Sequence, residues 1–319
     1  MLKESGFYKG INLGGWLSQC DYSEDRLNSF ITEKDFAVIA SWGFDHVRLP
    51  VDYNVIQDAQ GSMIEEGLAR VDAALECCEK NGLHMVLDLH KTPGFSFDPQ
   101  EKELGFFRSE ADQQRFYSIW ECFAARYADR SELLMFDLLN EITEPSYLED
   151  WIRISAECIR RIRCFAPDVR ILIGSYHHNA VSAVKDLPAP ADDRVFYSFH
   201  CYDPHTYTHQ GAYWMSGVEG FDVDARVSFR DTGVTPAFFE ELFASAFEKA
   251  QAEGTELYCG EYGVIDIVPP EDALGWFRTI HEVFEKYGIA RSVWTYREMD
   301  FGLADTRMDT VRKELLSCL

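Results

Sequence analysis

The feature of this sequence that most constrains its fold is a repeated alternation of short apolar segments with longer amphipathic ones. The short segments are rich in β-branched and aromatic residues, as buried strands are. In the longer segments apolar residues recur at spacings of three and four, and several end at a glycine, such as Gly43, Gly82 and Gly288. The eight candidate strands are GINLGG (10–15), HVRLPV (46–51), HMVLDLH (84–90), LLMFDLLN (133–140), VRILIGSY (169–176), VFYSFHCY (195–202), ELYCGEYG (256–263) and RSVWTYRE (291–298).

A strand, a loop and a helix repeated in this way predict parallel strands joined by crossover helices, which is an α/β fold. Eight such units are the number that closes a (β/α)8 TIM barrel. The length of 319 residues fits one barrel of this kind. No Gly/Ser linker, charge block or low-complexity tract divides the chain, so we expect residues 1–319 to form a single domain.

The repeat is uneven in two places. A short connection between the fifth and sixth candidate strands leaves room for a short helix around 179–187, before LPAPADD interrupts it. After the sixth candidate strand a long insertion, residues 203–236, carries Tyr207, Tyr213 and Trp214. Insertions of that length in a compact domain are usually functional.

The charge of the chain limits its partners. The net charge is −24, which argues against nucleic acid and anionic membrane surfaces, and a neutral substrate fits better. The alternative is that the acidity as a whole only maintains solubility. No obligate protein partner is evident from the sequence.

The cysteines and the first residues bear on the compartment. The nine cysteines are an odd number without a paired framework or Cys-x-x-Cys spacing, so we interpret them as reduced thiols. The first residues, MLKESGFYKGINLGGW, show no basic segment followed by an apolar run, and no later stretch is apolar enough to span a bilayer. We expect a cytoplasmic protein, or a secreted one if a signal peptide has been removed.

Polar and aromatic side chains gather near the carboxyl ends of the candidate strands, where barrel enzymes carry their chemistry. Any one of them could cap a helix, fill the core or satisfy a backbone group. Eight together indicate an active site. They are Arg48, His90, Asn140, Glu141, His200, Tyr202, Glu261 and Trp294.

These residues and their neighbours resemble glycoside hydrolase family 5, a family of retaining β-glycosidases, over essentially the whole chain. The family's Asn-Glu motif after strand four is matched by LLNEITEP (138–145), and its nucleophile motif by CGEYG (259–263). HVRLP, LDLH, FHCY and VWTY match the remaining positions. One departure is local: many members place proline directly after Asn-Glu, whereas Ile142-Thr143-Glu144 precedes Pro145 here.

The resemblance implies that Glu141 is the general acid/base and that Glu261 is the nucleophile. Retaining hydrolysis needs a protonated carboxylic acid for the leaving oxygen and a carboxylate about 5–5.5 Å away to attack the anomeric carbon. We therefore expect a raised pKa for Glu141. Arg48 would keep Glu261 charged, and Tyr202 would donate a hydrogen bond to the same carboxylate.

The other matched positions would bind the sugar. Asn140 would bind the 2-hydroxyl, His90 and His200 would bind hydroxyls or tune proton affinity, and Trp294 would offer an apolar face to the reacting sugar. Each histidine could instead be a satisfied core residue. Neighbouring His177 and His178 remain open between the two interpretations.

Two other classes of function are weaker. A metal-dependent hydrolase would need a ligand cluster such as His-x-His on the first strand, and GINLGG has no histidine, so neither a metal nor a cofactor is expected. An inert glycan-binding barrel would have lost one of the two glutamates, and both Glu141 and Glu261 are present.

The substrate implied by the resemblance is a β-glucan polysaccharide or oligosaccharide. An endo-β-1,4-glucanase, a cellulase, is the leading hypothesis; an exo-β-1,3-glucanase and a β-mannanase are the alternatives. Loop aromatics would serve as stacking platforms for successive sugars; the alternative is that half of them pin the loops onto the barrel. They are Phe95, Phe97, Tyr207, Tyr213 and Trp214.

Overall fold

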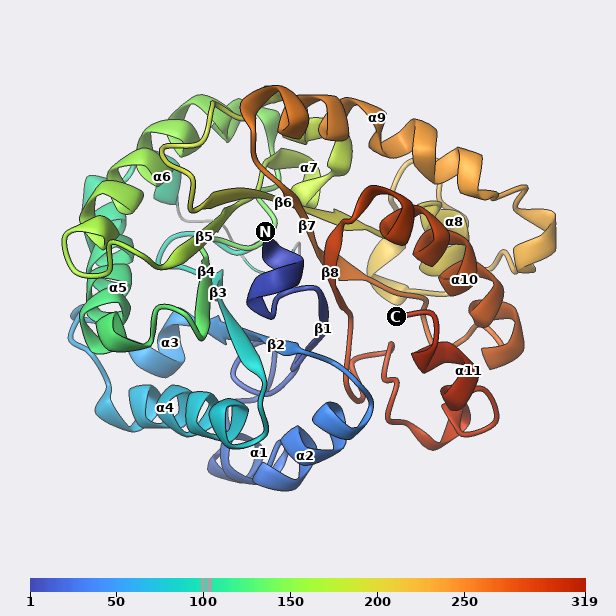
Figure 1. Ribbon diagram of the computed structural model, residues 1–319, viewed down its shortest axis with the longest axis horizontal. Helices are drawn as coiled ribbons and strands as arrows, with labels where there is room; N and C mark the ends of the chain where they lie inside the picture. The colour runs from blue at the N-terminus through green and yellow to red at the C-terminus, as the bar shows by residue number, and fades with distance from the viewer. Residues whose placement is uncertain (99–100, 102–104) are drawn as a thin grey trace.

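The computed structural model describes residues 1–98, 101 and 105–319, and within them eight parallel strands pair in chain order to close a barrel (Figure 1). The predicted α/β barrel is confirmed. The strands are buried almost throughout, because the barrel interior covers one face and the helices cover the other. They are β1 (Lys9–Asn12), β2 (His46–Asp52), β3 (His84–Lys91), β4 (Leu134–Asp137), β5 (Arg170–Ile173), β6 (Val195–Cys201), β7 (Leu257–Tyr262) and β8 (Ala290–Val293).

The predicted strand ends differ from the observed ones where the chain leaves the ladder to build the open end of the barrel. The segment 133–140 pairs only over β4, so Asn140 and Glu141 lie beyond the strand. β8 likewise ends just before Trp294. By contrast, β2 is longer than predicted and continues to Asp52. Arg48 therefore lies in mid-strand, whereas the sequence suggested a place near the strand end.

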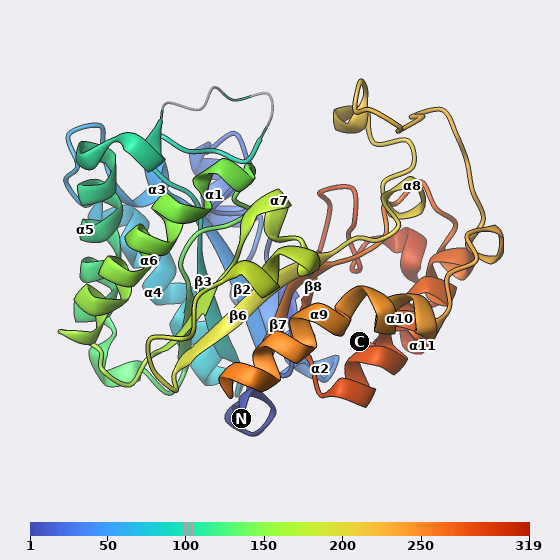
Figure 2. The same cartoon turned by 90° about the horizontal axis from the view of Figure 1, so that it is seen from above.

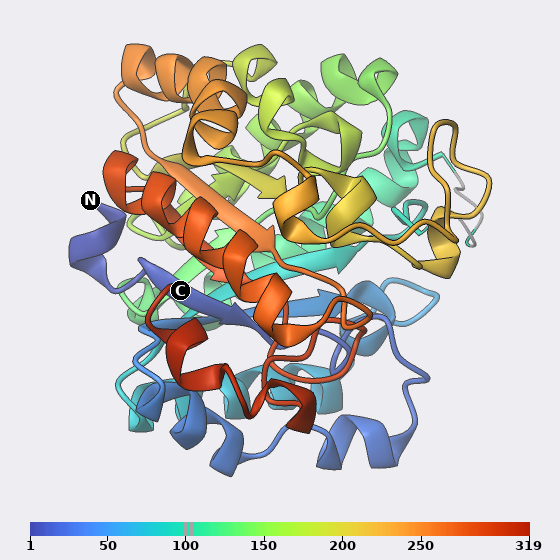
Figure 3. The ribbon, with the colours of Figure 1, turned by 90° about the vertical axis from the view of Figure 1, so that its right-hand side faces the viewer.

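Helices form the outer ring, and the amphipathic segments that end at Gly43, Gly82 and Gly288 are confirmed as α2, α4 and α10. Thr32 and Asp35 form a capping box at the start of α2. Figure 3 shows α10 lying along the outside of β7. The α-helices are α1 (Glu24–Ser29), α2 (Glu33–Ser41), α3 (Tyr53–Ile56), α4 (Glu65–Lys80), α5 (Glu110–Arg126), α6 (Leu148–Arg163), α7 (Tyr176–Asn179), α8 (His205–Thr208), α9 (Pro236–Glu253), α10 (Pro270–Tyr287) and α11 (Arg312–Leu316).

The amino-terminal end of the barrel is closed by the chain itself. A 3-10 turn, η1 (Leu2–Ser5), lies over the centre of the barrel in Figure 1. Leu2, Phe7 and Tyr8 are buried there in a hydrophobic cluster with strand residues such as Met135 and Leu172. This end therefore contributes stability, and the opposite end, where the strands finish, is left for the site.

The two uneven connections differ from each other. The short helix predicted at 179–187 is a 3-10 helix, η5 (Val181–Asp186), and α7 before it contains left-handed residues. The long insertion after β6 holds α8 and two short turns, η6 (Tyr213–Met215) and η7 (Phe229–Asp231), before α9 begins. Figure 2 shows this insertion standing at the end of the barrel opposite the amino terminus.

The structure also describes the state of the cysteines and the lengths of the apolar helices. All nine cysteines are free thiols, as predicted. Among the helices in the described residues, none is both long and apolar enough to cross a membrane.

Candidate active site

Arg48 lies at the buried bottom of the site. Its Nη1 donates to Glu261 Oε1 at 2.8 Å and its Nε donates to Asp137 Oδ2 at 3.1 Å. Its Nη2 lies 3.1 Å from Asp88 Oδ2. Burial alone would lower the pKa of Arg48, but the three carboxylates raise it, so the guanidinium stays charged. One fully buried cation thus faces three carboxylates.

Glu261, on β7, has a hydrogen-bond donor on each carboxylate oxygen. Arg48 donates to Oε1, and the Tyr202 hydroxyl donates to Oε2 at 2.9 Å. Burial, followed by the charge of Glu261, raises the pKa of Tyr202, so the phenol keeps its proton and remains a donor. The carboxylate is therefore fixed in orientation, as the sequence predicted for these three residues.

The strand pairing beside Glu261 brings His200 close to it. The register between β6 and β7 shifts just before His200, which then pairs with Glu261. A side chain at Gly260 would place its Cβ only 3.0 Å from His200 Nε2. The glycine of the CGEYG motif therefore leaves room for the histidine ring.

Glu141 follows β4 in a left-handed backbone conformation, with φ of 44°. Its Oε1 lies 2.8 Å from His200 Nδ1, and its Oε2 lies 3.2 Å from His178 Nδ1. His200 Nδ1 is also 3.6 Å from Glu261 Oε2, so this imidazole stands between the two glutamates.

The spacing of the two carboxylates indicates the kind of chemistry. An oxygen of Glu141, an oxygen of Glu261 and a nitrogen of His200 all lie within 4.8 Å of one another. This matches the separation of about 5–5.5 Å in retaining glycosidases and is too short for the 6.5–9.5 Å of inverting ones. Three such groups could also hold a metal ion, but Arg48 already supplies a cation to Glu261, so the donor set suits proton transfer better.

The protonation of Glu141 in the free enzyme differs from the sequence-based expectation. Burial raises its pKa, but hydrogen bonds from His178 and His200 outweigh burial and lower it. Burial opposes protonation of His200, yet Glu261 and Glu141 raise its pKa overall. The pKa of His178 is also raised, because its bond to Glu141 outweighs burial. The expected raised pKa of Glu141 is therefore wrong for the free enzyme, in which the imidazoles compete for the acid's proton.

Asn140 is positioned by Arg48 so that its amide can bind a ligand. Its Oδ1 accepts from Arg48 Nη2 at 3.0 Å. Its Nδ2 is buried and has no hydrogen-bond partner within the described part of the chain. A buried amide donor without a partner is costly unless a ligand satisfies it, which suits the predicted contact with a sugar hydroxyl.

His90 and Trp294 form a pair of parallel rings at the end of β3 and after β8. Their centroids are 5.8 Å apart and their planes differ by 4°. Burial lowers the pKa of His90 to about 4, so it is neutral, and its Nδ1 lies 2.6 Å from Asp88. Trp294 is only 7% exposed, so any contact with a sugar uses a small part of the indole.

The loop aromatics differ in exposure, which agrees with the alternative that part of the set pins the loops onto the barrel. Phe95 and Tyr207 are buried and hold their loops in place. Phe97 packs edge-on against His90. Tyr213 is 69% exposed on the insertion, and Trp214 beside it is partly buried. The ring of Trp214 lies 6.1 Å from that of His209, which packs on Tyr202.

Three functional residues were missed or left open by the sequence argument. Asp88 and Asp137 lie inside the apolar strands HMVLDLH and LLMFDLLN, and both are fully buried beside Arg48. A lone charge within a buried strand is the signal that would have found them. His178 was left open because nothing in the sequence shows that its turn folds back onto Glu141.

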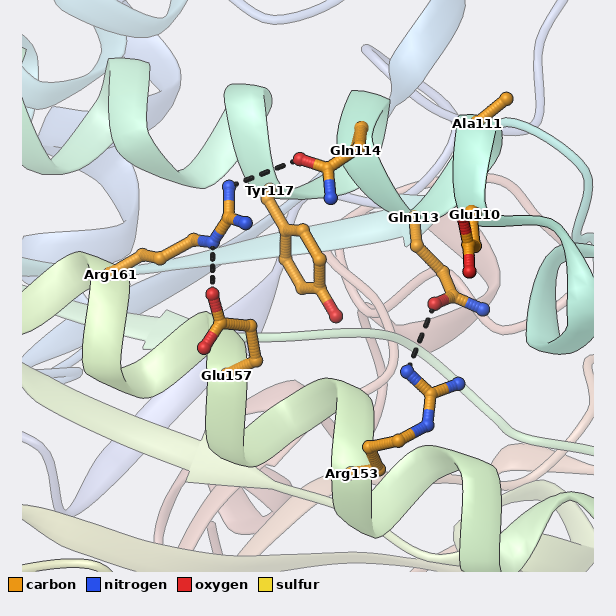
Figure 4. Close-up of a pocket in the computed structure, with 8 residues that line it drawn as sticks. All are labelled: Glu110, Ala111, Gln113, Gln114, Tyr117, Arg153, Glu157 and Arg161. Carbon is orange, nitrogen blue, oxygen red and sulfur yellow. Dashed lines mark hydrogen bonds and ion pairs between the residues drawn. The ribbon is translucent and has the colours of Figure 1, made fainter.

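A separate groove of about 630 Å³ lies on the outer ring between α5 and α6 (Figure 4). One of its two glutamates, Glu157, forms ion pairs with Arg161 and with Arg160 beside it. The groove shares no residue with the strand ends, so it is not the candidate active site. It is lined by Glu110, Ala111, Gln113, Gln114, Tyr117, Arg153, Glu157 and Arg161.

Comparisons with known proteins show the family to which a chain with this geometry is similar. The model of the Cellulase family, glycosyl hydrolase family 5, matches residues 8–300, which include every strand of the barrel. Cellodextrinase A of Ruminococcus flavefaciens is 54% identical over 291 residues, covering 91% of this chain and 86% of that protein. Endoglucanase C of Acetivibrio thermocellus is 35% identical over 337 residues, covering 98% of each chain.

A solved structure with the same fold is that of Thermotoga maritima Cel5A in complex with a mannotriose substrate. It matches with a TM-score of 0.81 and 26% identity, over 99% of this chain and 98% of that one. The strands that carry the candidate site therefore belong to a fold already seen with a bound oligosaccharide.

Proposed function

The chain belongs to glycosyl hydrolase family 5, and from this premise we propose that Glu261 and Glu141 cleave β-1,4-glucosidic bonds with retention of configuration. The protein is a glycoside hydrolase of the β-1,4-glucanase type. The observation that carries the assignment of roles is the contrast between two carboxylates within 4.8 Å of each other. Glu261 is held by a guanidinium and a phenol, whereas Glu141 is held by two imidazoles.

In the first step Glu261 is the nucleophile. One of its oxygens bonds to the anomeric carbon while the bond from that carbon to the leaving oxygen breaks, and Glu141 gives its proton to the leaving oxygen. Arg48 and Tyr202 hold the attacking carboxylate in place. Asn140 Nδ2 donates to the 2-hydroxyl, a contact that strengthens in the transition state.

In the second step Glu141 changes role. It accepts a proton from water, the water oxygen bonds to the anomeric carbon, and the ester to Glu261 breaks. Two displacements at one carbon restore the β configuration. Glu141 then holds the proton needed for the next turnover.

We propose β-1,4-linked glucose chains as the substrate, in the form of cello-oligosaccharides and of internal bonds in longer β-glucans. Relatives named cellodextrinase and endoglucanase support these two forms. The net charge of −24 suits a neutral polysaccharide and disfavours nucleic acid and anionic membranes as partners. The mannotriose complex of Cel5A makes a β-mannan the second substrate to test.

The assigned roles predict different losses for the two glutamates. Glu261→Gln abolishes turnover on every substrate, because no nucleophile remains. Glu141→Ala lowers kcat/KM on cellotetraose by about 10²–10⁴-fold. It largely spares the first step for a dinitrophenyl cellobioside, whose leaving group needs no proton. Initial rates on both substrates, beside wild type, measure this.

The stereochemistry and the substrate are tested with the wild-type enzyme. Proton NMR of a fresh cello-oligosaccharide digest should show the β-anomer first, and an α-anomer appearing first would refute the nucleophile assignment. A panel of carboxymethyl cellulose, cello-oligosaccharides, laminarin and mannan, with product sizes, separates β-1,4-glucanase action from the alternatives. Turnover of laminarin or mannan alone would contradict the proposed substrate.

A further inference from the structure

The connection after β5 has an unusual backbone. Three consecutive residues, His177, His178 and Asn179, have φ of 52°, 54° and 56°, so they form a left-handed turn without a glycine. Non-glycine residues enter this region at an energetic cost, and a run of three persists only where its surroundings enforce it. Such strain is typical of segments that position functional side chains.

The turn is fixed from two sides. The backbone N–H of His177 donates to Thr143 O at 3.1 Å, and that of His178 donates to Ile142 O at 2.9 Å. Asn179 is fully buried next to Gly174, where a Cβ would lie 2.3 Å from the Asn179 amide. The turn is therefore tied to the loop that directly follows Glu141.

The side chain of His178 reaches Glu141 as a result. Its Nδ1 lies 3.2 Å from Glu141 Oε2, the oxygen that His200 does not bind. The His178 side chain is 51% exposed, so the ring is partly open to water. His200 is 2% exposed, and its Nε2 has no partner among the described residues. Of the two imidazoles, His178 therefore holds a positive charge at the lower desolvation cost.

We propose that His178 is a positioning residue that shares the acid proton with Glu141, so that this proton is lost from the pair and not from Glu141 alone. The inference rests on the proposed function of Glu141 as general acid. The proton moves along one hydrogen bond, leaving His178 Nδ1 as it joins Glu141 Oε2, and the reverse step restores the ion pair. Two groups coupled in this way titrate with macroscopic values that belong to the pair.

The charged and titratable groups around this pair are compatible with such sharing. Glu144 adds a negative charge near His178 and favours its protonation. Glu141 faces His200 directly, with Tyr202, Asp88, His90 and His209 at longer range. Glu261 lies on the far side of His200. His90 and His209 are neutral, since burial lowers their pKa to about 4 and about 3 respectively.

The test is the pH profile of His178→Asn. Asparagine tolerates the left-handed conformation and keeps a side-chain N–H, but it does not titrate. Glu141 then keeps only the buried His200 as an imidazole partner, so the alkaline limb of kcat/KM on cellotetraose moves to lower pH by about one unit. On the dinitrophenyl cellobioside, where the first step needs no acid, the profile should show no such movement.

The matched control is His177→Asn. His177 has the same backbone conformation one residue earlier, and its ring packs edge-on against Tyr176. This variant should keep the wild-type profile on both substrates. An unmoved limb in His178→Asn, or an equal shift in His177→Asn, would overturn the proposal while leaving the proposed function standing. Absence of β-glucan turnover in wild type would overturn both.

A second measurement needs no turnover. In wild type the His178 imidazole, followed by two-dimensional NMR of 15N-labelled histidine and assigned with His178→Asn, should titrate above the ordinary value of 6.5. In Glu141→Gln it should titrate at lower pH, because the anionic partner is gone. An unchanged His178 titration in Glu141→Gln would contradict the sharing of a proton.

Discussion

At the residue scale, the centre of the site is a concentration of buried charge around a single arginine. Asp88 and Asp137 lie opposite each other on β3 and β4, and both reach Arg48. The Oδ1 atom of each is buried without a hydrogen-bond partner among the described residues. Burial, opposed by Arg48, raises the pKa of both to about 6. The barrel interior thus favours the protonated form of a carboxyl that an unfolded chain would ionise.

This predicts an inverted pH dependence of stability at Asp137. Because the folded-state pKa is about 6 and the ordinary value is 3.8, the folded state binds more protons between them, and stability falls as pH rises through that window. The stabilisation from protonated Asp137 is fully present below pH 4. About 3 kcal/mol of the free energy of unfolding is lost by pH 8. Asp137→Asn removes it, so the variant gains stability relative to wild type as pH rises.

Urea unfolding of both proteins at pH 4, 6 and 8 measures this difference in the free energy of unfolding. The control is Asp129→Asn, which removes a carboxylate from the exposed Asp129 of η3 (Ala128–Arg130). A difference between Asp137→Asn and wild type that stays constant with pH would show that Asp137 is ionised throughout.

At the scale of elements, the insertion after β6 connects a surface aromatic pair to the site through a chain of packed rings. Tyr202 follows β6, His209 packs edge-on against it, and Trp214 packs against His209. Tyr213, on the same turn as Trp214, faces solvent. The insertion is therefore suited to bind sugar units remote from the bond that is cleaved.

We predict that Trp214→Ala lowers kcat/KM for cellohexaose about 3–10-fold, in line with the loss of one aromatic contact. The effect on a dinitrophenyl cellobioside should be much smaller, because that substrate cannot reach a remote subsite. Steady-state kinetics on both substrates tests this. Equal losses would show that Trp214 acts through His209 and Tyr202 and not on the sugar.

At the scale of the whole molecule, the barrel separates stability from chemistry along its axis. The amino-terminal end, which carries the start of the chain in Figure 2, is filled by η1 and the side chains that follow it, and the opposite end holds the glutamates. Phe7 is fully buried at the closed end and packs against the rings of His46 and His84. A substitution there should change the free energy of unfolding and leave the catalytic pH profile unchanged.

Phe7→Ala should lower the free energy of unfolding by about 3–5 kcal/mol, through lost burial and the cavity left behind. The pH profile of kcat/KM should stay at its wild-type position. Phe165→Ala is the matched control, since Phe165 is 47% exposed, and its change should stay within about 0.5 kcal/mol. A shifted pH profile in folded Phe7→Ala would show coupling between the two ends of the barrel.

Much of the fold and most of the site could be predicted from residues near in sequence. The alternation of apolar and amphipathic segments is a local pattern, and eight repeats of it suffice for a barrel. Glu141, Glu261 and Tyr202 were found because each stands at or near a strand end in a short motif, and Arg48 was found through the motif HVRLP although it lies in mid-strand. Their predicted contacts, Arg48 and Tyr202 with Glu261, are present.

What the sequence determined by itself is therefore the order of the elements and the residue types that meet at the open end of the barrel. The tertiary structure alone decided the protonation of Glu141, because His178 reaches it from the connection after β5 and His200 reaches it from β6. It also decided which loop aromatics are buried, as Phe95 and Tyr207 are. Proton affinity and burial depend on neighbours that are distant in sequence, and closure of the barrel is what makes them neighbours.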